Sequence, residues 1–163
     1  MGANNFLIVG GSSGIGLEIF TELEDKGDEI YVGSRSSNKL ADLSGIHHLP
    51  LDVTEHPVHL EGLPDVLNGL VYCPGTIRLK PFHLLTRDEF LEDLQISFLG
   101  AVQVIQTSLP NLRQSPTGAS ILLFNTVAVE TGMAFPHSGS PALRRPSFSS
   151  FRRSGSVAGW VSI

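Results

Sequence analysis

The stretch that decides the fold is Phe6-Leu-Ile-Val-Gly10-Gly-Ser-Ser-Gly14-Ile-Gly16, in which an apolar run leads directly into spaced glycines. An uninterrupted apolar run is typical of a strand that is buried on both faces, as in parallel sheets. Gly10 and Gly14 allow a tight turn that approaches a pyrophosphate, and Gly16 allows the next helix to pack closely on the strand. The stretch therefore predicts a phosphate-binding turn between a strand and a helix N-terminus.

An amphipathic helix follows this turn. Ile15, Ile19, Phe20 and Leu23 recur at helical spacing with glutamates among them, which predicts one buried stripe on a surface helix. A second strand, 29–33, comes after the helix at the spacing of a right-handed crossover. We therefore expect a sheet that is parallel from its first strands.

The residues that follow the second strand, Ser34 and Arg35, predict the cofactor. An acidic residue at this place would accept hydrogen bonds from the adenosine ribose of NAD. The sequence has no carboxylate here, and the planar guanidinium of Arg35 suits the 2′-phosphate of NADP instead. NADP is therefore favoured over NAD, and the alternative is that Arg35 is a solvated loop charge.

Two further strands bring polar residues to the same end of the sheet. The third ends at Leu51-Asp52-Val53, where Asp52 suits the adenine amino group; alternatively, Asp52 is a turn or N-cap residue before Thr54. The fourth, 69–72, runs into a Pro-Gly turn that contains Gly75. We expect this turn beside the first glycine turn, where open α/β sheets bind ligands.

Two more helices and a fifth strand complete the expected elements. A short helix is expected over 37–43, and a capping box, Thr86-Arg-Asp-Glu89, opens the longest helix. We expect Pro110 to end that helix and Gly100 to mark close packing against a neighbour. The fifth strand, 120–124, is almost wholly apolar. The long helix carries one apolar stripe: Leu91, Leu94, Phe98, Val102, Ile105 and Leu109.

Composition limits the class of protein. The chain has 163 residues, is 41% hydrophobic and 17% charged, and has a formal net charge of −5, which indicates one soluble domain without general attraction to nucleic acid or membrane. Cys73 is the single cysteine, and we interpret it as a small buried residue. His56 and His59 lack a third ligand at suitable spacing, so no metal is expected. We expect a cytoplasmic protein.

The tail after Gly132 has a different character. It contains no Asp, Glu or Lys, and it includes the pairs Arg144-Arg145 and Arg152-Arg153 among many Ser, Pro and Gly residues. Such a composition buries too little apolar surface to offset chain entropy. We interpret 133–163 as a disordered or out-of-frame tail; a basic tail that binds a partner is the alternative. Without a sixth strand, 121–124 would form a bare apolar edge.

Residues 6–132 resemble the short-chain dehydrogenase/reductase family. The glycine turn resembles the family's Thr-Gly-x-x-x-Gly-x-Gly turn, and Leu51-Asp52-Val53 resembles its adenine-contacting segment. The resemblance implies a Rossmann-like doubly wound parallel sheet of about five strands in the order 3-2-1-4-5, incomplete in this chain. It also implies that Thr126 takes the place of the catalytic serine and Ser97 that of an asparagine in the long helix. We accordingly interpret 1–132 as the NAD(P)-binding domain.

The chain departs from the family at its central acid/base pair. In the family's Tyr-x-x-x-Lys motif, the lysine lowers the pKa of a tyrosine that transfers a proton while hydride leaves the nicotinamide. This sequence has no tyrosine after Tyr72 and no lysine after Lys80. Of the family's Asn-Asn-Ala-Gly segment, only Gly75 remains. We therefore expect a truncated or frameshifted member that is inactive or atypical.

The resemblance implies an oxidoreductase that moves hydride between NADP(H) and a small carbonyl or alcohol substrate. The alternatives are a non-catalytic dinucleotide-binding protein and an inactive truncated product. In the family the long helix commonly forms a subunit interface, which makes a homo-oligomer one expectation. The cofactor-binding residues predicted from the sequence and the resemblance are Gly10, Ser12, Ser13, Gly14, Ile15, Gly16, Ser34, Arg35, Asp52, Val53 and Gly75.

Overall fold

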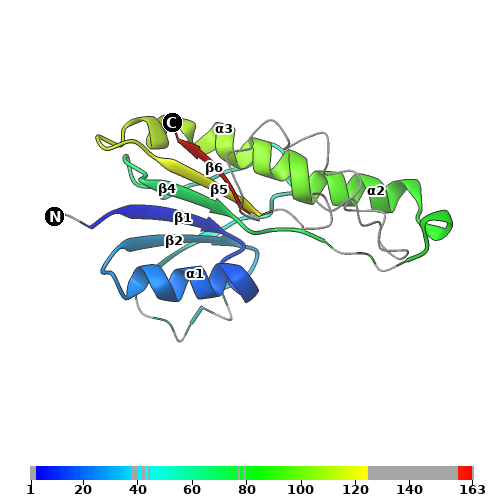
Figure 1. The fold of residues 1–163 in the computed structure, drawn as a ribbon, viewed down its shortest axis with the longest axis horizontal. Helices are drawn as coiled ribbons and strands as arrows, with labels where there is room; N and C mark the ends of the chain where they lie inside the picture. Colours follow the sequence, from blue (N-terminus) through cyan, green and yellow to red (C-terminus); the bar gives the residue numbers. More distant parts are fainter. Residues whose placement is uncertain are drawn as a thin grey trace.

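A sheet with helices on both faces forms the centre of the molecule (Figure 1). The computed structural model describes residues 3–37, 40–41, 43, 45–76, 78, 80–124 and 158–162. The strands are β1 (Asn5–Val9), β2 (Glu29–Ser34), β3 (Ile46–Pro50), β4 (Gly69–Tyr72), β5 (Ser120–Phe124) and β6 (Ala158–Ser162). The helices are α1 (Gly14–Glu24), the 3₁₀-helix η1 (Phe82–Leu84), α2 (Arg87–Leu94), the π-helix η2 (Gln95–Leu99) and α3 (Gly100–Arg113).

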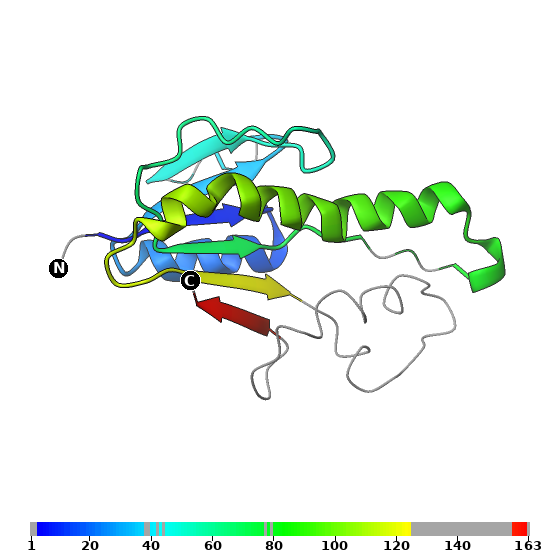
Figure 2. The same ribbon diagram turned by 90° about the horizontal axis from the view of Figure 1, so that it is seen from above.

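The apolar run of β1 is buried on both of its faces. Successive side chains of a strand point to opposite sides of a sheet. Leu7 and Val9 accordingly join the core beneath α3, whereas Ile8 joins the core that packs on Phe20 of α1, and all four are at most 1% exposed. Figures 1 and 2 show α1 on one face of the sheet and the continuous α2–η2–α3 rod on the other. Because helices cover both faces of the sheet, both sides of β1 are apolar, and polar and apolar residues do not alternate along it.

The predicted parallel sheet of five strands, in the order 3-2-1-4-5, is confirmed. A sixth strand was not predicted: β6 pairs antiparallel with β5 and places Val161 opposite Ile121. The expectation of a bare edge at 121–124 is therefore wrong, because the backbone of β6 supplies hydrogen-bond partners along β5. The segment Ala-Gly-Trp-Val-Ser is too short for a clear period, and it lies within a polar tail. Residues 125–157 lie outside the described part of the chain, so the disorder of the tail stays a prediction.

The long helix differs from its prediction in length and in its buried face. Pro110 lies inside α3, and the helix continues to Arg113. Tertiary contacts hold this last turn: Leu112 is 1% exposed, and the side-chain amide of Asn111 donates to the carbonyl of Pro64 over 2.7 Å. The residues of α3 that are buried are Gly100, Ala101, Val104, Ser108 and Leu112, rather than the predicted apolar stripe.

Three of the buried residues of α3, namely Gly100, Ala101 and Ser108, are small, and α3 lies close to the sheet on this face. The predicted close packing at Gly100 is confirmed: a Cβ atom there would lie 2.6 Å from the Tyr72 hydroxyl oxygen and 2.9 Å from Cβ of Val53. The π-helix η2 precedes Gly100 and shifts the helical phase, and Leu91 is left 46% exposed. A stripe extrapolated at a constant α-helical period therefore misses the buried side.

The remaining differences concern local elements. The helix expected over 37–43 is not seen in its described residues, where the N–H of Leu40 bonds the Ser37 carbonyl in a turn. Ile15 does not join the buried stripe of α1 and is 58% exposed. None of the helices in the described ranges is long and apolar enough to cross a membrane.

Candidate functional site

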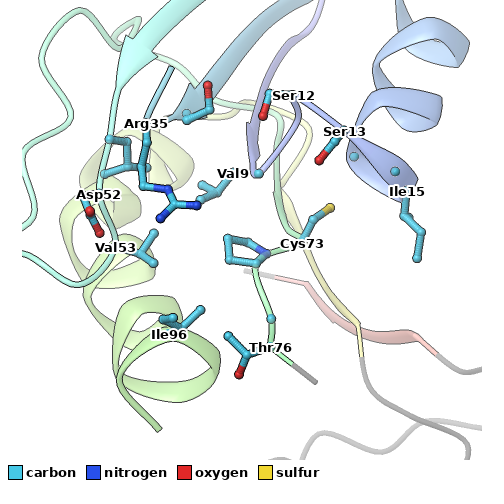
Figure 3. A pocket seen from close by; sticks show the side chains of 18 of the residues that line it. Val9, Ser12, Ser13, Ile15, Arg35, Asp52, Val53, Cys73, Thr76 and Ile96 are labelled. Carbon is cyan, nitrogen blue, oxygen red and sulfur yellow. The ribbon is translucent and has the colours of Figure 1, made fainter. Parts of the chain in front are cut away.

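A pocket of about 440 Å³ opens at the carboxyl ends of β1, β2 and β4 (Figure 3). The structure brings every cofactor-binding residue predicted from the sequence to its lining: Gly10, Ser12, Ser13, Gly14, Ile15, Gly16, Ser34, Arg35, Asp52, Val53 and Gly75. These residues come from four separate stretches of chain. The parallel order of the strands is what makes them meet, because it places all of the strand ends at one edge of the sheet.

The glycine turn forms one wall of the pocket through its backbone. Gly10 and Gly14 have φ angles of +77° and +55°, which L side chains rarely adopt. A Cβ atom at Gly16 would lie 2.5 Å from the carbonyl oxygen of Gly10, whereas a Cβ atom at Gly14 would have no atom within 4 Å. Gly16 thus permits the packing of α1 on the turn, and Gly14 leaves space in front of it.

The N-terminus of α1 also faces the pocket. Ser13 occupies the N-cap position with extended backbone angles, but its side chain makes no cap hydrogen bond. The first turn carries no acidic residue, and Gly14, Ile15 and Gly16 all line the pocket. The positive end of the helix dipole is therefore directed at the cavity without a side chain that neutralises it.

Arg35 and Asp52 provide all of the charged side chains among the described residues of the lining. Figure 3 shows them on one side of the pocket, with Ser13 and Ile15 on the other. Arg35 is exposed and follows the last residue of β2, while its charge helps to lower the pKa of Asp52. The pocket therefore has a cationic group at the end of β2 and the N-terminus of α1 at the opposite side.

Asp52 makes a local turn, as one of the two interpretations of the sequence proposed. Its Oδ1 accepts hydrogen bonds from the Thr54 hydroxyl over 2.7 Å and from the Thr54 N–H over 2.9 Å. These two bonds hold the pKa of the Asp52 carboxyl below its ordinary value, and Arg35 lowers it further. Both bonds use Oδ1, and the half-buried side chain still lines the pocket. The turn and a contact with adenine are therefore compatible.

The segment after β4 forms a second wall of the pocket, next to the glycine turn. The hydroxyl of Tyr72 donates to the carbonyl of Ile96 and ties β4 to η2. Cys73 is half-buried, and burial raises the pKa of its thiol to about 11, so it stays protonated at neutral pH, which supports its interpretation as a packing residue. The ring of Pro74 approaches the glycine turn, since a Cβ atom at Gly10 would lie 3.2 Å from its Cδ.

A charged network anchors the continuation of this wall to α2. The hydroxyl of Thr76, which lines the pocket, donates to Oδ1 of Asp93, which is 6% exposed. Arg78 pairs with Glu92, and it lies 3.5 Å from Asp93 and 3.6 Å from Glu89. The network was not predicted, because no motif in the sequence relates these positions.

Other lining residues missed by the sequence reasoning are mostly chain neighbours of predicted ones. Val9, Gly33, Leu51, Thr54, Cys73, Pro74 and Thr76 all lie within two residues of a predicted site residue, so the strand-end signal that found the site also marks them. Ile96 comes from η2, and only its place before Ser97 points to it. Thr126, the predicted catalytic residue, lies outside the described residues. No group of three potential metal ligands occurs in the described ranges.

Comparisons with known proteins agree on the family. The short chain dehydrogenase family matches residues 4–138. A curated relative, the "Uncharacterized oxidoreductase DltE" of Bacillus subtilis, is 31% identical over 144 residues, which are 77% of this chain and 57% of the relative.

Solved structures show the same fold. The "RhlG/NADP active-site complex" of Pseudomonas aeruginosa superposes with a TM-score of 0.80 at 21% identity, over 91% of this chain and 64% of that one. A short-chain dehydrogenase of Leptospira borgpetersenii with bound NAD⁺ gives a TM-score of 0.76 at 18% identity, over 88% and 60% of the two chains. The chain thus spans less than two thirds of the length of each of these proteins. With its parallel sheet, its glycine turn and these matches, this chain belongs to the short-chain dehydrogenase family.

Proposed function

We propose that this chain binds NADP(H) in the pocket at the carboxyl end of its sheet. The convergence of the glycine turn, Arg35, Asp52 and Gly75 on one cavity is the observation that carries the proposal. The cavity suits a dinucleotide in shape, because Gly14 leaves open space in front of the turn and the N-terminus of α1 lacks a neutralising side chain.

Each part of the pocket has a separate task in this proposal. The turn from Gly10 to Gly16 and the first N–H groups of α1 hold the pyrophosphate. Asp52 accepts a hydrogen bond from the adenine amino group while Oδ1 keeps its bonds with Thr54. Arg35 pairs with the 2′-phosphate through its planar guanidinium. Residues 1–132 are the proposed binding domain.

The proposed reaction class is hydride transfer between NADP(H) and a carbonyl or alcohol. NADP(H), when bound, supplies or accepts the hydride. Thr126 is the proposed hydrogen-bond donor to the substrate oxygen. The relatives support the class in different ways: one is named an oxidoreductase, and the two structures hold NADP and NAD⁺ respectively.

A second candidate is a dinucleotide-binding protein without turnover. The observation that favours it is the sequence, which has no tyrosine after Tyr72 and no lysine after Lys80 to form the family's acid/base pair. Measured oxidation of NADPH with a panel of ketones distinguishes the two candidates. Turnover above the rate of a Thr126→Ala variant supports the oxidoreductase, and NADPH binding without turnover supports the second candidate.

Arg35→Ala tests the choice of cofactor. We expect the dissociation constant of NADPH to rise about tenfold, because a charge-assisted pair with the 2′-phosphate is lost, while that of NADH stays within twofold. Fluorescence titration of both cofactors gives the two constants. Arg113→Ala is the matched control, since Arg113 is exposed at the end of α3 and does not line the pocket. Equal affinities of the unmodified protein for NADPH and NADH would overturn the preference for NADP.

A further inference from the structure

His48 of β3 contacts the end of β2 directly beside the pocket. Its Nε2 lies 3.1 Å from Oγ of Ser34 and 3.2 Å from the carbonyl oxygen of Ser34. Ser34 lines the pocket and is 7% exposed, whereas His48 lies outside the lining. His48 therefore reaches the pocket only through Ser34.

The direction of these hydrogen bonds follows from the acceptors. A carbonyl oxygen only accepts, so Nε2 of His48 carries the hydrogen. The hydroxyl of Ser34 is then free to direct its own hydrogen to the carbonyl of Ser36, over 2.9 Å. The N–H of Leu51 also donates to the Ser34 carbonyl, over 3.1 Å. Together these bonds fix the backbone of the residues on both sides of Arg35.

We propose that His48 is a positioning residue that sets the preference of the pocket for NADP(H) over NAD(H). Arg35 is the one cationic side chain in the described lining, and its chain neighbours Ser34 and Ser36 are joined by the hydroxyl that His48 orients. A long, exposed arginine binds a phosphate more tightly when its backbone is held in place in advance. This inference rests on the proposed binding of NADP(H).

The preceding residue provides a matched control. His47 projects to the other face of β3, where its Nε2 lies 3.0 Å from Glu29 and its ring stacks on Tyr31 with centroids 4.6 Å apart. His47 is not part of the lining, and its contacts with Glu29 and Tyr31 lie away from Ser34 and Arg35. Its loss removes a histidine from the same strand without touching the end of β2.

The test uses four variants of the full chain: His48→Leu, His48→Asn, His48→Gln and His47→Leu. Leucine has no donor and asparagine is too short to reach Ser34, whereas glutamine retains an N–H donor at about the distance of Nε2. Fluorescence titration with NADPH and NADH gives the ratio of the two dissociation constants, and circular dichroism verifies that each variant is folded.

We expect the NADPH affinity of His48→Leu and His48→Asn to fall roughly fivefold, as befits the loss of one neutral hydrogen-bond network. NADH affinity should stay within twofold, and His48→Gln and His47→Leu should keep the ratio of the unmodified protein. An equal loss for both cofactors, or an unchanged ratio in His48→Leu and His48→Asn, overturns the role of His48 while NADP binding itself stands. A ratio near one in the unmodified protein, by contrast, overturns the proposed cofactor preference.

Discussion

The two walls of the pocket are built by different physical means. The wall of residues 10–16 is backbone, shaped by glycines whose missing Cβ atoms allow positive φ angles and close approach. The other wall, residues 73–76, is held by side chains: Thr76 donates to a carboxylate of α2, and Arg78 and Lys80, which follow this wall in the chain, pair with further carboxylates of α2. The walls meet where the Pro74 ring lies against Gly10.

The two walls should therefore respond differently to substitution, to pH and to salt. Steric exclusion by backbone is indifferent to pH and salt, and any side chain in the wrong place disrupts it. A network of ion pairs tolerates small changes of shape but depends on the charge of each member. We therefore expect the glycine wall to be sensitive to substitution and the charged wall to be sensitive to protonation.

Gly16→Ala should have the largest effect. Its Cβ atom would lie 2.5 Å from the Gly10 carbonyl oxygen and 2.9 Å from Cα of Gly11, and neither backbone atom can move without reshaping the turn. We expect a loss of about 3 kcal/mol in the free energy of unfolding and at least tenfold weaker NADPH binding. Chemical denaturation and fluorescence titration measure the two effects.

Gly14→Ala is the control for this clash. It also adds one methyl group, but no atom lies within 4 Å of that position, so only the strain of φ +55° remains, at about 1 kcal/mol. Gly16 has no positive φ, so equal losses of stability in the two variants would contradict the view that the contact with the Gly10 carbonyl makes glycine necessary at 16.

Asp93→Ala should have the next largest effect, on the charged wall. Asp93 is 6% exposed, accepts from Thr76 and lies beside Arg78, so its loss leaves the half-buried Thr76 hydroxyl without this acceptor and Arg78 without a nearby carboxylate. We expect about 2 kcal/mol of destabilisation, less than for a fully buried pair because the Arg78 side chain is 26% exposed. Chemical denaturation gives the value.

Glu92→Gln provides the comparison within the same network. Its carboxylate also pairs with Arg78, but its side chain is 55% exposed, and we expect a change below about 0.5 kcal/mol. Equal losses in the free energy of unfolding for Asp93→Ala and Glu92→Gln would show that burial of the carboxylate does not determine its contribution to the network.

The two walls also differ in how far the sequence predicts them. Gly10, Gly14 and Gly16 act through local sterics, so their spacing beside an apolar run was sufficient to predict the turn and the parallel strands around it. The pairs of Thr76 with Asp93 and Arg78 with Glu92 join a loop to a helix 14 to 17 residues further along, and no periodic pattern encodes them. The capping box at Thr86 involves residues only three positions apart, so the sequence predicts it, and the structure confirms it.

The misses have the same cause. Pro110 was expected to end the long helix, but contacts of Asn111 and Leu112 with distant parts of the chain extend it. The burial of Gly100 rather than Leu91 depends on the π-helix η2, which residue propensities do not predict. β6 depends on a pairing between segments more than 30 residues apart. Tertiary contacts decide each of these points, and they are not visible in a single sequence.

Glu89 distinguishes the two walls by the pH dependence of the free energy of unfolding. Bonds with the Lys80 ammonium and the Thr86 N–H lower the pKa of Glu89 to about 2. Because the folded-state pKa lies below the ordinary value of about 4.3, the stabilisation is complete above pH 4.5 and is lost as the pH falls towards 2. Glu89→Gln retains the shape and the N3 position of the capping box but removes the charge.

We therefore expect the free energies of unfolding of the unmodified protein and of Glu89→Gln to differ most at neutral pH and to converge near pH 2. Urea denaturation followed by circular dichroism at several pH values measures this. Gly14→Ala should remain parallel to the unmodified protein over the same range, because the glycine wall contains no titrating group. Parallel curves for Glu89→Gln would show that Lys80 and Glu89 do not couple in solution, and the contrast between a steric and an electrostatic wall would then rest on Asp93 alone.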